Sequence, residues 1–310
     1  FPLRVVTAEA TRALLALGGV AAERTGSALE IHGRLVMVDA PCAGVHMGWA
    51  AYFAACAAAA WLRLPDRTFV RRLPLIGAFV LAGNVLRMLD NVLTSFIETA
   101  PDSMHRAKYS ALRERSVGLG VMGFHSFLQS KGIPMESAMA KSWNLRIFKK
   151  IRREADAASY ILAEERGACP DAAERGMKAR FSHKIAIAPT ASISIICGGT
   201  SACIEPIPAN IYTHKTLSGS FAVKNPYLER LLEEKGQNTA AIWDSILENE
   251  GSVQHLDFLS QDEKDVYKTA FELDQRWVVE LAADRTPDVC QSQSVNIFLP
   301  GDVDKWDLHM

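Results

Sequence analysis

The sequence changes character near residue 88, and this change most limits what the chain can fold into. Residues 1–87 hold only five acidic residues and are rich in alanine and leucine. From residue 88 onward the charges are mixed, and glycine and proline separate amphipathic segments. A chain of 310 residues can form one large domain or two ordinary ones. We therefore predict two parts, residues 1–87 and residues 88–310.

The first part has the pattern of a membrane segment. Residues 44–62 carry one ionisable side chain, His46, and residues 73–86 are apolar apart from Asn84. The first run is long enough to cross a bilayer as a helix, whereas the second is short. The loop between them is arginine-rich, as cytoplasmic loops are. We expect a helical, transmembrane N-terminal segment in the inner membrane, with membrane contact through residues 44–87; two buried alanine-rich core helices are the alternative.

Two residues of this part could carry chemistry. Cys42 precedes the first apolar run, and Arg87 closes the second. A guanidinium near a cysteine lowers the thiol pKa and favours a nucleophile. The alternative is structural, with Cys42 as a small buried side chain and Arg87 as an anchor at the helix end.

The order of these features resembles the exosortase/archaeosortase family of membrane cysteine transpeptidases. The resemblance rests on a β-rich stretch at residues 28–38, the motif PCAG, an apolar helix, the arginine-rich loop and AGNVLR. It implies Cys42 as nucleophile and Arg87 as its partner. The third catalytic residue of that family lies on a later helix that has no counterpart here, so this part should be inactive.

The second part reads as an α/β protein. Strands separated by helices indicate a largely parallel sheet. We predict strands at residues 184–188 and 294–299, and helices at 138–166, 224–234, 239–249 and 260–283. Ser260 and Glu263 have the spacing of a capping box at the start of the last helix.

Three glycines near the start of this part imitate a dinucleotide-binding fingerprint. Gly118, Gly120 and Gly123 have the spacing GxGxxG, but no acidic residue follows about 20 positions later at the end of a second strand. We therefore interpret them as sites of close packing between a strand and a helix.

The segment after residue 188 is the candidate ligand site. A β-branched run ends at Pro189, and small residues and hydroxyls follow in Thr190-Ala191-Ser192-Ile193. Such a segment offers backbone N–H groups and hydroxyls to a phosphate without a cationic side chain. We predict a phosphate site at residues 189–193, with a plain Ser/Thr turn as the alternative.

Charge and cysteine content exclude other classes. The net charge of -1 gives no basic field for nucleic acid. The cysteines lack CxxC or histidine-bracketed spacing, so neither a zinc site nor a disulfide framework is expected. We predict no metal site, and buried or packing roles for four cysteines of the second part, Cys169, Cys197, Cys203 and Cys290.

Several motifs of residues 86–310 resemble the C-terminal half of the large, catalytic subunit of class I ribonucleotide reductase. They are SVGLGVMGF, EERGACP, HKIAIAPTASIS, CGGTSACIEPIPANIYTHKTLSGSF and QSVNIFLPGDVDKWDLHM. The resemblance implies part of a ten-stranded α/β barrel, an oxidoreductase that makes deoxyribonucleotides in the cytoplasm, and a nucleoside diphosphate at residues 189–193. It also implies a homodimer, a radical from a separate metal-containing small subunit, electrons from thioredoxin or glutaredoxin, and no cofactor bound by this segment.

The resemblance also predicts what this chain cannot do. The N-x-C-x-E arrangement of that family occurs nowhere in the sequence. The paired tyrosines of the family normally follow DKWDLHM, where this chain stops. We expect an internal piece of a longer protein that holds the phosphate loop but is inactive as a reductase. A membrane cysteine transpeptidase, also incomplete, is the alternative function. Because both resemblances meet at residues 84–90, we expect a fusion there.

Overall fold

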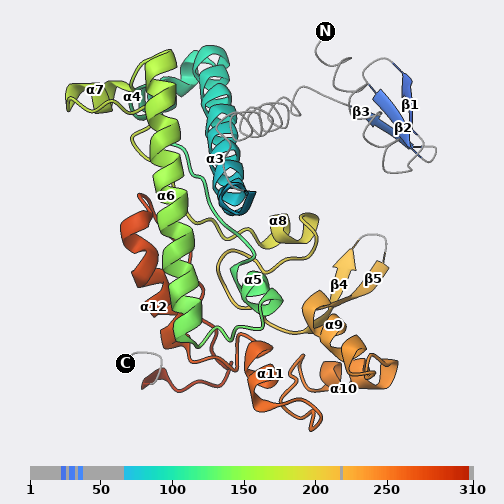
Figure 1. Cartoon of the computed structure of the whole chain (residues 1–310). Helices are drawn as coiled ribbons and strands as arrows, with labels where there is room; N and C mark the ends of the chain where they lie inside the picture. Colours follow the sequence, from blue (N-terminus) through green and yellow to red (C-terminus); the bar gives the residue numbers. More distant parts are fainter. Residues whose placement is uncertain (1–21, 26–27, 32–33, 38–65, 217–218, 307–310) are drawn as a thin grey trace.

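The computed structural model describes residues 22–25, 28–31, 34–37, 66–216 and 219–306 (Figure 1). An antiparallel sheet of β1 (Ala22–Thr25), β2 (Ala28–Ile31) and β3 (Arg34–Met37) comes first and confirms the β-rich stretch. The elements that follow are α3 (Asp66–Thr99), η2 (Asp102–Met104), α4 (His105–Glu114), α5 (Phe124–Ser130), α6 (Ala138–Arg166), α7 (Pro170–Glu174), α8 (Ala191–Ile196), β4 (Ile211–Thr216), β5 (Gly219–Lys224), α9 (Pro226–Glu234), α10 (Ala240–Glu248), α11 (Gln261–Val266), α12 (Gln275–Arg285) and η3 (Thr286–Asp288).

Two long helices, α3 and α6, pack against each other, and α12 packs against the other end of α6 (Figure 1). Helix α6 begins where the Ser137 hydroxyl accepts a hydrogen bond from the Ala140 amide at 3.1 Å, and it ends before Gly167 at φ 85°. The predicted helix at residues 138–166 is therefore confirmed. Its buried face has helical spacing and comprises Ala140, Asn144, Phe148, Ala155, Ala158 and Leu162.

Helix α3 is continuous through residues 87 and 88, the boundary between the two predicted parts. Among the helices of the described residues, none combines the length and the apolar character that a bilayer crossing requires. The membrane helix predicted at residues 73–86 is not confirmed, because that apolar run is short and has Arg72 and Arg87 at its ends. Residues 44–62 lie outside the described residues.

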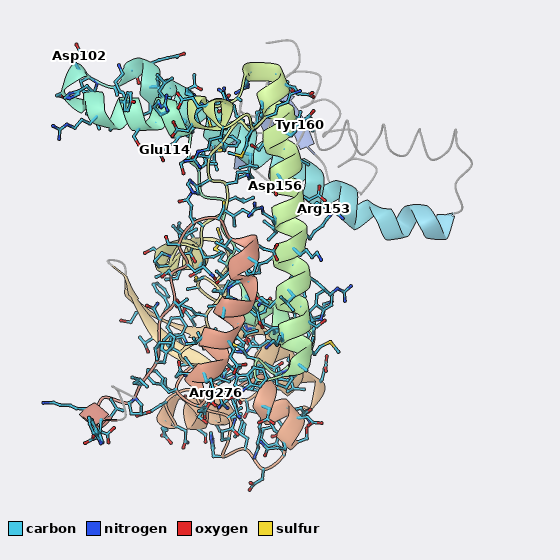
Figure 2. All side chains as sticks on the ribbon, turned by 90° about the vertical axis from the view of Figure 1, so that its left-hand side faces the viewer. Asp102, Glu114, Arg153, Asp156, Tyr160 and Arg276 are labelled. Atoms are coloured by element: carbon cyan, nitrogen blue, oxygen red, sulfur yellow. The ribbon has the colours of Figure 1, made fainter. Side chains whose placement is uncertain are left out.

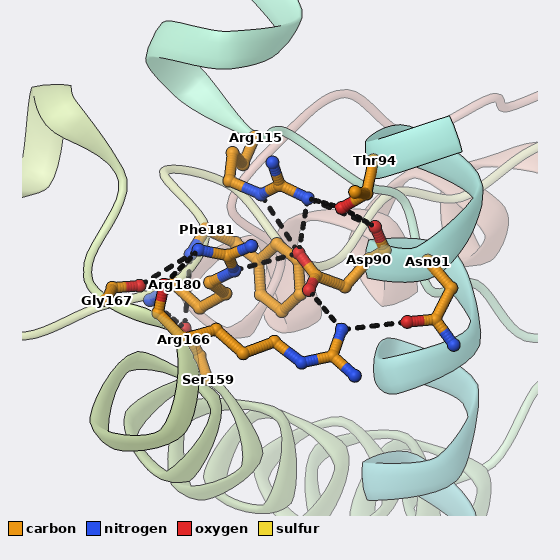
Figure 3. Close-up of polar contacts among 9 residues, drawn as sticks. All are labelled: Asp90, Asn91, Thr94, Arg115, Ser159, Arg166, Gly167, Arg180 and Phe181. Carbon is orange, nitrogen blue, oxygen red and sulfur yellow. Dashed lines mark hydrogen bonds and ion pairs between the residues drawn. The ribbon is translucent and has the colours of Figure 1, made fainter. Parts of the chain in front are cut away.

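A buried carboxylate joins α3 to three other segments (Figure 3). Asp90 is fully buried, and guanidinium groups of Arg115, Arg166 and Arg180 bond to its two oxygens at 2.7–2.9 Å. Burial would raise the pKa of Asp90, but the hydrogen bonds from the three arginines outweigh burial and hold the pKa below its usual value. Arg115 lies two residues before the extended segment 117–119, and Arg180 lies four residues before the segment 184–187, so Asp90 ties the chain on the N-terminal side of both segments to α3.

Three extended segments form a small parallel sheet. Residues 117–119 pair with residues 184–187, which pair in turn with residues 291–294. The Leu119 amide donates to Lys184 O at 2.8 Å, and the Ser294 amide donates to Ile187 O at 2.9 Å. The strand predicted at 184–188 is confirmed only as a paired extended segment, in which Ile185 and Ile187 form single parallel bridges. The strand predicted at 294–299 is wrong in position, because the pairing ends at Ser294. Beyond this residue, the Asn296 amide donates to Glu205 instead.

Glycines make the close approach within this sheet possible. A Cβ on Gly120 would lie 2.7 Å from Ala186 O, and one on Gly118 would lie 3.2 Å from Ala186 Cβ. Gly123 has φ 82°, and a Cβ there would lie 2.5 Å from Thr200 Oγ1. The three glycines are therefore sites of close packing, but they pack against a neighbouring extended segment and a loop, and not between a strand and a helix as predicted.

A second hydrophobic core lies beneath the β4–β5 hairpin and includes Leu228, Leu232, Trp243 and Ile246. Helices α9 and α10 confirm the helices predicted at 224–234 and 239–249 within two residues at each end. The single helix predicted at 260–283 is wrong. The capping box of Ser260 and Glu263 starts α11, but residues 267–274 leave the helix, and the Asp274 side chain caps the start of α12. The break lets the Ala270 amide donate to Ile207 O at 2.8 Å.

Candidate functional site

The candidate site lies at the carboxyl ends of the three parallel segments. There the chain continues from residues 117–119 into α5, from 184–187 into α8, and from 291–294 into residues 295–298. Side chains and amides that follow parallel strands gather at one edge of the sheet, which is where ligands bind in α/β folds. In Figure 2 the label of Arg276 marks the start of α12, and the side chains of the surrounding segments gather around this helix.

The predicted phosphate segment sits at this edge as the start of a helix. Residues 191–196 form the short helix α8, which follows Thr190 without a side-chain cap hydrogen bond. The first intrahelical bond runs from the Ser194 amide to Thr190 O at 2.8 Å. The three amides before it, of residues 191–193, have no partner within the helix. Ser192 and Ile193 are exposed.

Thr190 also holds a neighbouring loop in place. Its backbone is left-handed at φ 50°, and its hydroxyl oxygen accepts a hydrogen bond from the Cys203 amide at 2.7 Å. The side chain therefore ties α8 to the loop at residues 199–205. Its hydroxyl proton remains available for donation, because the Cys203 amide uses a lone pair of the oxygen.

The loop at residues 199–205 is held on its other side by α5. The Ser201 amide donates to Ser126 Oγ at 2.8 Å, and the Ser126 amide donates back to Ser201 Oγ at 3.2 Å. The Gly123 amide donates to Ser201 O at 2.8 Å. Segments that follow two neighbouring strands thus fix one another, which positions the start of α8.

Two functional-site features escaped prediction. One is the β4–β5 hairpin, although residues 211–224 contain the β-branched and aromatic residues of a hairpin. The other is Glu205, which is buried and accepts hydrogen bonds from the amide and side chain of Asn296. A pairing across 91 residues leaves no local signal in the sequence.

The four cysteines of the second part differ in burial. Cys169 and Cys203 are buried, and burial raises the pKa of Cys203, whose thiol donates to Ser294 O at 3.6 Å. The amide of Lys184 donates to Cys290 Sγ at 3.0 Å. These three confirm packing roles. Cys197 contradicts the prediction because it is exposed, at the end of the short helix α8.

The predicted nucleophile pair is not brought together in the described residues. Arg87 forms an ion pair at 2.7 Å with Glu165 of α6, and both side chains are partly exposed. Cys42 lies outside the described residues. Arg87 therefore joins α3 to α6, and its pairing with Cys42 stays a prediction.

The buried side chain of His125 makes the stability of the protein depend on pH. It is buried on α5, its Nδ1 accepts a hydrogen bond from the Ile207 amide at 3.0 Å, and burial lowers the pKa of the ring to about 4. The unfolded chain binds this proton near pH 6.5, so stability is full above that pH and falls as the pH drops toward 4.

We therefore expect the free energy of unfolding to decrease between pH 6.5 and pH 5, measured by urea denaturation. The substitution His125→Gln keeps an acceptor for the Ile207 amide but cannot titrate, so its pH slope over this range should be smaller. Equal slopes for the two proteins would contradict the buried neutral state of His125.

Two family models match different but overlapping parts of this chain. The family model described as "Ribonucleotide reductase, barrel domain" matches residues 80–179 and 170–309, and the model of the transmembrane exosortase family matches residues 1–106. A ribonucleoside-diphosphate reductase large subunit of Invertebrate iridescent virus 6 is 49% identical over 73% of this chain and 24% of its own length. The corresponding protein of Invertebrate iridescent virus 3 is 47% identical over 71% of this chain and 35% of its own length.

A solved structure is also similar. The class Id ribonucleotide reductase alpha subunit of Actinobacillus ureae matches with a TM-score of 0.68 at 39% identity, over 74% of this chain and 42% of that chain. The chain thus spans about a quarter to two fifths of the length of the proteins it matches.

Proposed function

Because this chain belongs to the ribonucleotide reductase large-subunit family, we propose that residues 189–193 bind the diphosphate group of a ribonucleoside diphosphate. The observation that carries this proposal is the position of α8, whose first three amides follow a parallel strand at the carboxyl edge of the sheet. Amides in this position bind anions through hydrogen bonds and the helix dipole.

The roles of individual residues follow from their contacts. The amides of Ala191, Ser192 and Ile193 would donate to phosphate oxygens, and the exposed Ser192 hydroxyl would add a further donor. Thr190 would hold the loop and keep only its hydroxyl proton for the ligand. Residues 189–203 contain neither lysine nor arginine, so binding would rest on dipoles and neutral donors.

The proposed binding is tested by calorimetric titration of the chain with ADP. Ser192→Ala removes one donor to a charged group, and we expect the affinity to fall about tenfold, which is about 1.4 kcal/mol. Ser110→Ala on α4 removes an exposed serine elsewhere and should leave the affinity unchanged. Identical heats for the wild type and Ser192→Ala would remove the assignment.

We propose that ribonucleotide reduction needs residues that this chain lacks. The family chemistry uses a cysteine, an asparagine and a glutamate in an N-x-C-x-E arrangement, and the sequence has none. A second copy, a radical-generating small subunit and a dithiol reductant remain proposed partners of the whole large subunit. Incubating the chain with these components should form no deoxyribonucleotide, and product detected by chromatography would contradict the proposal.

We also propose that two segments of different origin meet within α3. The two family models overlap on residues 80–106, inside and just after this helix. Long-read sequencing of the source DNA across codons 80–95 tests the junction. One unbroken reading frame in several independent clones would argue against a joining error.

A further inference from the structure

A pocket of about 270 Å³ lies at the carboxyl edge of the sheet. One wall is the face of α8 formed by Ala191, Ser194 and Ile195, which have helical spacing. The β4–β5 hairpin supplies a further wall that includes Lys224, whose Nζ lies 4.7 Å from the centroid of the Trp243 ring. Ser126 and Gln129 of α5 supply another wall. The rest is mostly apolar and includes Pro206, Ile207, Pro208, Val223 and Phe298.

The pocket contains one buried carboxylate. Glu205 is 4% exposed, its Oε1 accepts from the Asn296 amide at 3.0 Å, and its Oε2 accepts from Asn296 Nδ2 at 2.9 Å. Both donors are neutral. Among the side chains that the structure describes, the ion pairs involve other carboxylates and leave Glu205 without a cation.

Asp90, the other buried carboxylate described above, differs from Glu205 because it has cationic partners. Asp90 is also buried, and three guanidinium groups form ion pairs with it. A buried carboxylate is costly without a cation, even when neutral groups satisfy its hydrogen bonds. Glu205, in contrast, lines an open pocket. The space beside Glu205 is where a missing cation would fit.

We infer that this pocket binds a primary ammonium or guanidinium group on an apolar stem, with Glu205 as the counter-ion. The carboxylate would accept hydrogen bonds from the cation, and the apolar walls would cover the stem. The cation would lie against the 191/194/195 face of α8. Ser194 and Ile195 of this face take no part in the proposed phosphate site, which is tested separately with ADP. The cation belongs either to a free amine or to a lysine or arginine side chain of a polypeptide.

The test is a calorimetric titration of the whole chain with n-butylammonium chloride, with 1-butanol as the neutral probe of similar shape. We expect saturable binding of the amine, at least about tenfold weaker binding by Glu205→Gln, and no saturable binding of butanol. Glu248→Gln changes an exposed carboxylate on α10 and should bind like the wild type. Equal affinity in the wild type and Glu205→Gln, or equal binding of butanol, would overturn the inference.

If circular dichroism shows that Glu205→Gln does not fold, a second variant tests the same pocket. Val223→Phe fills the pocket from β5 without altering the contacts of Glu205 and Asn296, and it should abolish amine binding; unchanged binding would overturn the inference. Titration with N-acetyl-lysine methylamide separates the two sources. Tighter binding than that of n-butylammonium assigns the pocket to a polypeptide side chain, and weaker binding assigns it to a free amine.

Discussion

Replacing Asp90 by asparagine is expected to destabilise the protein by about 3–5 kcal/mol. The substitution keeps the shape of the side chain but leaves two buried guanidinium groups, of Arg115 and Arg180, without their counter-charge (Figure 3). Urea denaturation at pH 7 followed by circular dichroism measures the change. Glu98→Gln, an exposed carboxylate on the same helix, should change stability by no more than about 0.5 kcal/mol. Similar losses for both variants would contradict the role of Asp90.

The same carboxylate predicts an acid dependence. The pKa of Asp90 is lower in the folded protein than the value of about 3.9 in an unfolded chain. Its ionised form therefore stabilises the fold above about pH 4, and this contribution is lost as the pH falls through the folded pKa. In Asp90→Asn, the free energy of unfolding should therefore lose the part of its decrease below about pH 4 that Asp90 causes. The decrease that His125 causes at higher pH should remain.

The second large effect is expected for Gly120→Ala. The added Cβ would lie 2.7 Å from Ala186 O, a backbone atom of the neighbouring strand that no side-chain rotation can move. The two strands must separate, and overpacking of this kind costs about 1–3 kcal/mol or more.

The matched control is Gly83→Ala within α3, where a Cβ has nothing within 4 Å. Helix propensity there should stabilise the protein by up to about 1 kcal/mol. The two alanine substitutions thus have opposite expected signs in thermal unfolding. A stabilising Gly120→Ala would contradict the close strand pairing.

Local patterns predicted part of this fold well. The spacing of apolar residues in α6, the glycine after it, and the Ser260–Glu263 capping box depend on neighbours within a few residues. The strand at 184–188 and the segment after it also have local signals. These features were predictable because the physics that forms them is short-range.

The predictions that failed concern features that are set by contacts between residues far apart in the sequence. Residues 267–274 leave the helical pattern because the Ala270 amide bonds to Ile207 O, across 63 residues of sequence. Asp90 meets Arg180 across 90 residues, and Glu205 meets Asn296 across 91. No periodicity along the chain encodes such contacts.

The most direct test of the account is the response of three backbone amides to a nucleotide. In ¹⁵N-labelled protein, saturating ADP is predicted to shift the amide resonances of Ala191, Ser192 and Ile193, and adenosine without phosphate is predicted to leave them in place. Unchanged resonances at these three positions with ADP, or equal shifts with adenosine, would contradict a phosphate site at the start of α8.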